Sequence, residues 1–96
     1  MVLNVLNALA EPTRLAAISV LADGGEHCVC ELMQHLGATQ SRMSRHMQVL
    51  RQAALVVDRR DAQWVRYRLN PDMSPEIRKI TRAVLEAAEK QQRAAA

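Results

Sequence analysis

The chain begins with two stretches in which apolar residues recur at helical spacing. Leucines at every third position between residues 3 and 9 predict a short helix with one apolar stripe, which ends before Glu11-Pro12. Pro12 suits the first position of a second helix, because a backbone N–H at that position would have no partner within the helix. The glycines at 24 and 25 end this helix. Its expected buried residues are Leu15, Ile18 and Leu21 or their neighbours.

Two further helices are expected between residues 28 and 52. The first has apolar residues at positions i, i+3 and i+7 and ends at Gly37, since glycine readily adopts the left-handed conformation that closes a helix. Thr39 is suited to cap the second. The residues expected to face the core are Val29, Leu32 and Leu36 in the first helix, and Met43, Met47 and Leu50 in the second. This arrangement indicates a helix-turn-helix.

The spacing changes from helical to strand-like after residue 54. Residues 55–57 and the alternating run 64–69 indicate two strands, with the turn between them at 59–63. The second strand directs Val65, Tyr67 and Leu69 to one face and Trp64, Arg66 and Arg68 to the other. A helix-turn-helix followed by a basic hairpin is typical of a winged helix-turn-helix. We therefore expect a mainly α fold with about five helices and a two-stranded wing.

A last helix is expected after Ser74-Pro75-Glu76, which supplies a cap, a proline at the first position and an acid in the first turn. Its apolar stripe is Ile77, Ile80, Val84, Leu85 and Ala88. A chain of 96 residues has too little surface of its own to cover a stripe of this length. The stripe therefore predicts a two-fold dimer of single-domain chains, with the domain spanning residues 1–96.

The basic residues are concentrated in the second half of the helix-turn-helix and in the hairpin. Lys and Arg exceed Asp and Glu by 13 to 10, and seven arginines fall between residues 42 and 68. With the methionines of the fourth helix facing the core, its other face is polar and basic, and no acid occurs between residues 32 and 57. Such a face suits DNA phosphates and base edges, although a solvated helix face is the alternative.

The candidate DNA contacts come from the fourth helix and the wing. They are Gln40, Ser41, Arg42, Ser44, Arg45 and His46 from the helix, and Arg59, Arg60, Gln63 and Arg66 from the wing. For His46, the interpretation we favour is a hydrogen-bonded histidine at the rim of the core.

Both cysteines of the chain, Cys28 and Cys30, lie where the third helix starts. Thiols suit thiophilic metals and metalloids, whereas free cysteines of a core are simply small buried side chains. Residues two apart on a helix point roughly 160° apart, so both sulfurs cannot lie in the core. An intact helix also cannot direct both to one ion, and we expect the chain to be extended or unwound at 28–30 when a ligand binds. Cys30 is the expected cap of this helix.

Other classes of protein fit the chain poorly. No apolar run approaches the roughly 20 residues of a membrane span, and the apolar start lacks the basic region of a signal peptide. We therefore expect a cytoplasmic protein whose two cysteines are thiols rather than a disulfide. An enzyme such as a thiol reductase is not expected, because the chain has no Cys-x-x-Cys, no glycine-rich phosphate loop and no acid or base grouped with the cysteines.

Four segments resemble the ArsR/SmtB family of metalloregulatory repressors, over roughly residues 3 to 90. They are Leu-Ala-Glu-Pro-Thr-Arg-Leu at 9–15, Cys-Val-Cys-Glu-Leu at 28–32, Gln-Ser-Arg-Met-Ser-Arg-His-Met at 40–47 and Trp-Val-Arg-Tyr-Arg-Leu at 64–69. The resemblance implies a homodimer held by the first and last helices, which binds operator DNA and leaves it when a metal or metalloid binds. The residues expected at the dimer interface are Leu3, Leu6, Ile77, Ile80, Val84 and Leu85.

The resemblance also implies the inducer, since arsenic-responsive members hold As(III) or Sb(III) through a Cys-Val-Cys box, here Cys28 and Cys30. No organic cofactor is implied. These members often have a third cysteine three residues after the second, where this chain has Met33. Hydroxide, a small cellular thiol or a group such as His27 is left to complete the shell. The alternatives are a thiol-redox sensor and a sensor of another thiophilic metal, such as Cd(II) or Zn(II).

Overall fold

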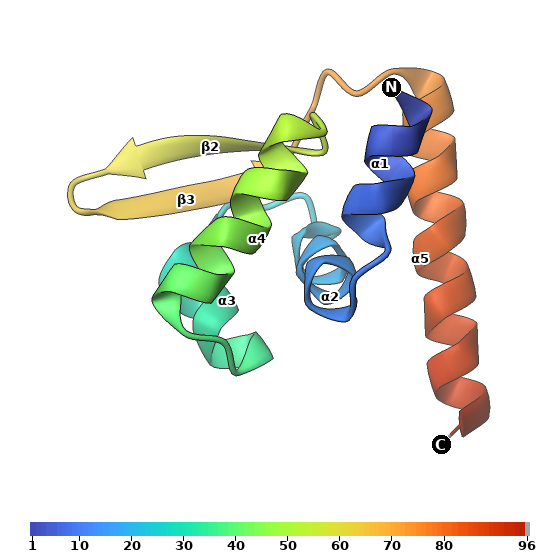
Figure 1. Cartoon of the computed structure of the whole chain (residues 1–96), viewed down its shortest axis with the longest axis horizontal. Coiled ribbons are helices and arrows are strands. Elements are labelled where there is room, and N and C mark those ends of the chain that lie inside the picture. Colours follow the sequence, from blue (N-terminus) through green and yellow to red (C-terminus); the bar gives the residue numbers. More distant parts are fainter. Residues whose placement is uncertain (96) are drawn as a thin grey trace.

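A computed structural model describes residues 1–95, which form five helices and a three-stranded antiparallel sheet (Figure 1). The helices are α1 (Val2–Leu9), α2 (Pro12–Leu21), α3 (Val29–Leu36), α4 (Gln40–Gln52) and α5 (Pro75–Ala95). The strands are β1 (His27–Cys28), β2 (Val56–Asp61) and β3 (Trp64–Leu69). The winged helix-turn-helix predicted from the sequence is confirmed, with one strand more than expected.

The predicted helix ends are confirmed where the sequence contains a recognisable signal. Gly37 closes α3 in the left-handed conformation, with φ 65°. The Thr39 hydroxyl accepts a hydrogen bond from the Arg42 N–H, 3.3 Å away, at the start of α4. The Ser74 hydroxyl accepts one from the Ile77 N–H at the start of α5. These ends depend on residues three or four positions apart, which is why the sequence alone predicts them.

The core lies between α2, α3, α4 and the wing. Its fully buried large side chains include Ile18, Leu21, Leu32, Met43, Met47, Leu50, Leu55 and Val56. All three residues predicted to face inward from α4 are among them. In α1 the outcome differs, because Val5, Ala8 and Leu9 are buried whereas Leu3 and Leu6 are exposed. Of the leucine stripe of α1, only Leu9 therefore lies on the face that α1 packs against its own chain.

The sheet differs from the predicted two-stranded wing. Its strand order is β1-β3-β2, and β1 consists only of His27 and Cys28, which pair with Tyr67 and Arg66. A strand of two residues has no detectable alternation, so the sequence could not reveal it. The prediction that residues 59–61 belong to a turn is also wrong. β2 continues to Asp61, which pairs with Trp64 and leaves a two-residue turn.

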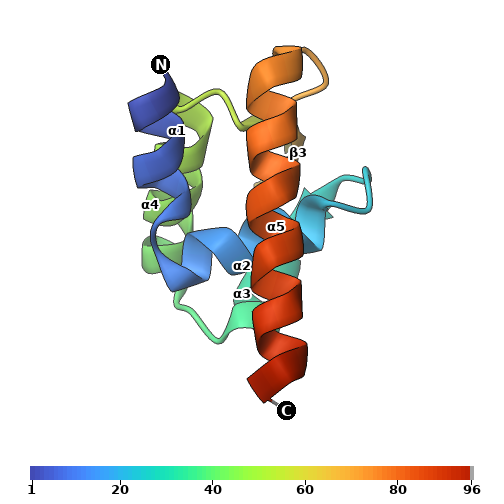
Figure 2. The ribbon, with the colours of Figure 1, turned by 90° about the vertical axis from the view of Figure 1, so that its right-hand side faces the viewer.

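The wing and the two terminal helices lie at opposite ends of the molecule. Figure 1 shows β2 and β3 projecting away from α5. Figure 2 looks at the end opposite the wing, where α1 and α5 face the viewer. The prediction that Ile77 needs a partner is wrong, because Ile77 is buried within its own chain. Ile80, Val84 and Leu85 are half-buried against the same core. In the described part of the chain, no helix is both long and apolar enough to cross a membrane.

Candidate DNA-reading surface and thiol site

The third helix begins at Cys28, and the prediction that Cys30 caps it is wrong. Cys28 has an extended backbone, and its sulfur accepts a hydrogen bond from the Cys30 N–H, 3.3 Å away. In return, Glu31 Oε1 accepts a hydrogen bond from the Cys28 N–H at 3.2 Å. This is a reciprocal capping box in which a cysteine sulfur takes the place of the usual hydroxyl. The glutamate three residues after Cys28 was the signal that the sequence interpretation missed.

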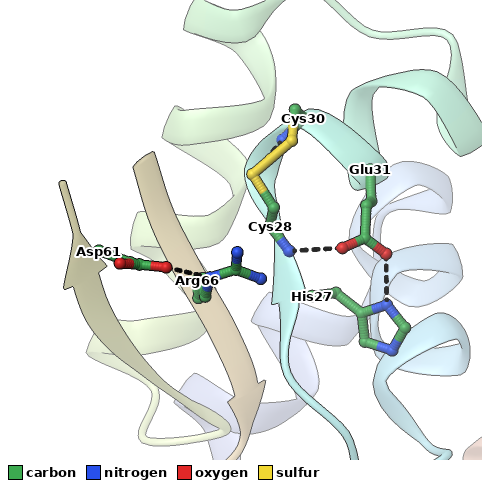
Figure 3. The surroundings of a disulfide bond; sticks show 6 residues. All are labelled: His27, Cys28, Cys30, Glu31, Asp61 and Arg66. Carbon is green, nitrogen blue, oxygen red and sulfur yellow. Dashed lines mark hydrogen bonds and ion pairs between the residues drawn. A yellow bond between two sulfur atoms is a disulfide. The ribbon is translucent and has the colours of Figure 1, made fainter. Parts of the chain in front are cut away.

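The two sulfurs lie together, although the residues are only two positions apart. Cys28 and Cys30 are joined as a disulfide in this structure, with their Cα atoms 5.2 Å apart (Figure 3). The prediction that the two cysteines are thiols is wrong for the protein in this structure. The sequence predicts a chain that is extended or unwound at 28–30 when a ligand binds, and the backbone is already extended at Cys28 in this structure. Because Cys28 belongs to β1 and only Cys30 lies in α3, the backbone already directs both sulfurs to one point.

Cys28 connects the wing to the helix-turn-helix. Its side chain is buried, with 4% of its surface exposed. As the last residue of β1 it pairs with Arg66 of β3, and as the N-cap of α3 it starts the first helix of the motif. Arg66 in turn donates from Nε to Asp61 Oδ2 at 2.9 Å, near the tip of the wing (Figure 3). The residue that carries this sulfur therefore belongs to both elements.

His27 lies between two carboxylates beside the thiol site. Its Nε2 is 2.8 Å from Asp23 Oδ2 and its Nδ1 is 3.1 Å from Glu31 Oε2. Burial alone lowers the pKa of His27, but the hydrogen bonds to both carboxylates outweigh it and raise the pKa. The Cys28 N–H and His27 both lower the pKa of Glu31. Because both ring nitrogens already have partners, His27 is poorly placed to complete a metalloid shell. Within residues 1–95, no three His, Cys, Asp or Glu side chains are grouped to hold a metal ion.

The fourth helix presents a polar and basic face. Gln40, Ser41, Arg42 and Arg45 are exposed and Ser44 is half-buried, while the methionines of the same helix are fully buried. Among the residues that the structure describes, Arg42, Arg45 and Arg60 make no ion pair, and Arg60 and Gln63 are exposed in the wing. The predicted separation of a buried face from a polar and basic face is confirmed.

Acids of the same chain pair with three other arginines of this region, Arg51, Arg59 and Arg66. Arg59 binds Glu26 through two hydrogen bonds, Nε to Oε2 at 3.0 Å and Nη2 to Oε1 at 2.7 Å. This pair crosses β3, because Glu26 precedes β1 and Arg59 lies in β2. The Arg59 guanidinium lowers the pKa of Glu26. The basic charge of the wing is therefore partly neutralised in the free protein.

His46 turns toward the second helix. Its Nδ1 lies 3.3 Å from Arg14 Nη1 and 3.6 Å from Glu11 Oε2, and 19% of its side chain is exposed. The interpretation as a hydrogen-bonded histidine at the rim of the core is confirmed. Neither Glu11 nor Arg14 was predicted as its partner. Their only signal was their place in the segment 9–15, because contacts across 32 residues leave no local pattern.

Comparison with known proteins places these features in context. Residues 11–57 match the model of the family described as "Bacterial regulatory protein, arsR family". The arsenic resistance transcriptional regulator ArsR2 of Pseudomonas putida is 40% identical over 84 residues, which cover 88% of this chain and 73% of that protein. The arsenical resistance operon repressor of Escherichia coli is 38% identical over 78 residues, 81% of this chain and 67% of that protein.

Solved structures with the same fold extend the comparison. HlyU from Vibrio cholerae superposes with a TM-score of 0.76 at 32% identity, over 90% of this chain and 89% of the other. A homodimeric winged helix-turn-helix DNA-binding domain from Mycobacterium bovis has a TM-score of 0.75 at 27% identity. This second likeness covers 93% of this chain and 79% of the other.

Proposed function

The chain belongs to the ArsR family of DNA-binding transcriptional regulators, in which its relatives include repressors of arsenical resistance, and we propose that As(III) or Sb(III) bound to Cys28 and Cys30 releases it from operator DNA. The observation that carries this proposal is the double role of Cys28, which caps α3 and pairs with the wing strand β3. A ligand on this sulfur reaches both parts of the DNA-binding unit.

The reduced state is the one that binds the metalloid, because thiolates are the ligands of soft ions. Compared with a free thiolate, a sulfur bonded to As(III) carries less negative charge and is a poorer acceptor for the Cys30 N–H, so binding weakens the cap that the thiolate provides. The backbone is already extended at Cys28, so both sulfurs reach one ion without unwinding of the helix. A coupling of only about 1 to 3 kcal/mol between the two sites changes operator affinity roughly 5- to 150-fold.

Two sulfurs leave one position of a trivalent metalloid to be filled. Since Asp23 and Glu31 engage both nitrogens of His27, hydroxide or a small cellular thiol is the third ligand we propose. Met33 is partly buried in α3, one turn after Cys30. Met33→Cys should therefore tighten the response by adding a third thiolate, and Met33→Ala should leave it intact.

We propose that DNA is bound through the exposed face of α4 and the basic residues of the wing. The homodimer uses Leu3 and Leu6, which are exposed, together with the half-buried residues Ile80, Val84 and Leu85 of α5. In such a dimer the two α4 helices lie roughly 34 to 36 Å apart, in major grooves one turn apart. Sedimentation showing a monomer at micromolar concentration would contradict this arrangement.

A thiol-redox sensor is the second candidate, because the structure shows the two sulfurs bonded. In that reaction the two thiols lose two electrons and two protons to an oxidant such as hydrogen peroxide, which becomes two waters. Because the cap of α3 is present with the disulfide formed, this candidate would act through the covalent link between β1 and α3, without any metalloid. The disulfide would also prevent As(III) from binding, so the two candidates differ in what prior oxidation does to operator binding. If the metalloid is the inducer, oxidised protein should stay on the operator and ignore As(III), whereas a redox sensor should leave the operator on oxidation alone.

One titration of operator binding tests these candidates. The reduced protein is mixed with labelled operator DNA, and As(III), Sb(III), Cd(II), Zn(II) or peroxide is added. We expect release by the metalloids at the lowest concentrations, and loss of that release in Cys28→Ser and Cys30→Ser with operator binding retained. Release by As(III) from a protein with both cysteines replaced by serine would contradict the proposed sensor. Release by peroxide alone would favour the redox candidate.

A further inference from the structure

The guanidinium of Arg14 connects three helices. Arg14 is the third residue of α2, and its Nε donates to the carbonyl oxygen of Ala8 at 2.7 Å. Its Nη2 donates to the carbonyl oxygen of Asn7 at 3.3 Å, and its Nη1 lies 3.3 Å from His46 Nδ1. Ala8 and Asn7 belong to the last turn of α1, whereas His46 lies in the middle of α4. One side chain thus bridges the first helix and the reading helix.

The base of this bridge is held in place. Glu11 caps α2 by accepting a hydrogen bond from the Arg14 N–H at 2.9 Å, and the same Oε2 lies 3.6 Å from His46 Nδ1. The side chains of Glu11 and His46 are only 29% and 19% exposed. α1, α2 and α4 also pack directly against one another (Figure 1). The bridge therefore lies in a partly shielded position, where its hydrogen bonds are less weakened by solvent.

The chemistry of the bridge requires arginine. Carbonyl groups in the last turn of a helix have no partner within that helix, so α1 offers acceptors at its end. A guanidinium presents several N–H groups in a rigid plane and can donate in two directions at once. A lysine ammonium is a single point on a flexible stem and cannot hold both helices in the same way. The acceptor on α4 is a ring nitrogen of His46, which an amide oxygen can replace and an aliphatic side chain cannot.

We propose that Arg14 is a positioning residue for operator recognition, which sets the orientation of α4 relative to α1 and thereby the separation of the two reading helices in the dimer. The inference rests on the proposed function, since it requires a dimer that includes α1 and that reads two half-sites. The separation must match the distance between successive major grooves. Without the bridge, each α4 takes a wider range of orientations, which lowers affinity for the best operator and weakens the preference for one half-site spacing.

The test uses a series of operators in which the half-site spacing is the optimum or differs from it by one or two base pairs. We expect Arg14→Gln, Arg14→Lys and His46→Leu to lose at least about fivefold in affinity for the optimal operator, the lower end of a typical coupling between sites. The ratio of affinities between optimal and altered spacing should also fall. His46→Gln is the matched comparison for His46→Leu, because its amide oxygen can accept from Arg14, and it should keep the spacing ratio of the original protein.

The spacing ratio separates positioning from a structural role. An equal loss of affinity at every spacing, or no loss, would overturn the inference. If Arg14→Gln does not fold, the pair His46→Leu and His46→Gln decides the question by the same ratio. Dimerisation and As(III) stoichiometry should be unchanged in the folded variants. Failure of the original protein to bind any operator would contradict the proposed function itself, whereas normal binding with unchanged variants would contradict only the role of Arg14.

Discussion

The two helices of the helix-turn-helix begin in different ways. α4 begins at Thr39, whose hydroxyl accepts a hydrogen bond from the backbone of its first turn. α3 is capped by Cys28, whose sulfur has the same task and is supported by the Glu31 carboxylate. A threonine hydroxyl neither ionises near neutral pH nor binds soft ions, whereas a cysteine can ionise, bind a soft ion or be oxidised. The two helices therefore differ in the chemistry of their caps, and only the cap of α3 has a sulfur that can bind a metalloid.

The same two regions also differ in exposure. The cap of α3 is buried and connected to β3, whereas α4 directs Arg42 and Arg45 into solvent. In the proposed function, sensing and reading thus depend on different residues of one compact unit. Substitutions in the two regions should therefore separate the response to As(III) from the affinity for DNA, and each of the following predictions tests this separation.

The largest expected effect comes from replacing Cys28. Cys28→Ser keeps an oxygen that can cap α3, so operator binding should stay nearly unchanged while the roughly 5- to 150-fold release by As(III) is lost. Cys28→Ala should lose the same response and also about 1 kcal/mol of stability, because its cap is missing. Operator binding with and without As(III), together with denaturant unfolding, measures both. Equal stability of the two variants would show that the cap at residue 28 contributes nothing.

The next effect concerns the reading surface. Arg45→Ala should reduce discrimination between the operator and altered sequences by about 1 to 3 kcal/mol, if a base contact is removed, while release by As(III) keeps its fold-change. Arg60→Ala, in the wing, should weaken binding to all sequences and lower the salt slope by about one. Titrations at several salt concentrations with specific and random DNA distinguish these results. A changed As(III) response in either variant would contradict the separation of the two regions.

A smaller effect is expected at the cap of α4. Thr39→Ala removes the hydroxyl that accepts from the Arg42 N–H, which should cost about 1 kcal/mol of stability. Operator affinity should fall with it, because Arg42 and its neighbours lie in the first turns of the reading helix. The fold-change caused by As(III) should stay the same. Thr39→Ser is the matched control and should retain the cap, and a lost As(III) response in Thr39→Ala would show that both caps belong to the sensor.

The smallest effect is the pH dependence of the α3 cap. The fold lowers the pKa of Glu31 from its usual value of 4.5. The ionised carboxylate therefore stabilises the protein fully at pH values above 4.5, and this contribution is lost as the pH falls through the lowered pKa. Glu31→Gln should therefore cost stability at pH 7 and less in acid. The difference should stay below about 1 kcal/mol, because 45% of the Glu31 side chain is exposed. In Thr39→Ala the cost should not vary with pH, since its cap does not titrate.

The sequence predicted α4 more completely than the start of α3. The helical spacing of Met43, Met47 and Leu50, with Thr39 before them, indicated the core face, the cap and the polar face of α4. For α3 the spacing indicated the helix and its end at Gly37, but not its first residue. Whether Cys28 or Cys30 caps α3 depends on the backbone conformation at residue 28. That conformation follows from pairing of Cys28 with Arg66, 38 positions later in the chain.

By itself, the sequence determined the helices, the hairpin, the family and the pair of cysteines, because each is expressed within a few neighbouring residues. Only the tertiary structure decided that β1 exists, that His46 turns to Arg14 and that Glu26 pairs with Arg59. The last two contacts join residues 32 and 33 positions apart. Hydrogen bonds over such distances form only after the elements have packed, so their partners are selected by proximity in the fold and leave no periodic trace in the chain.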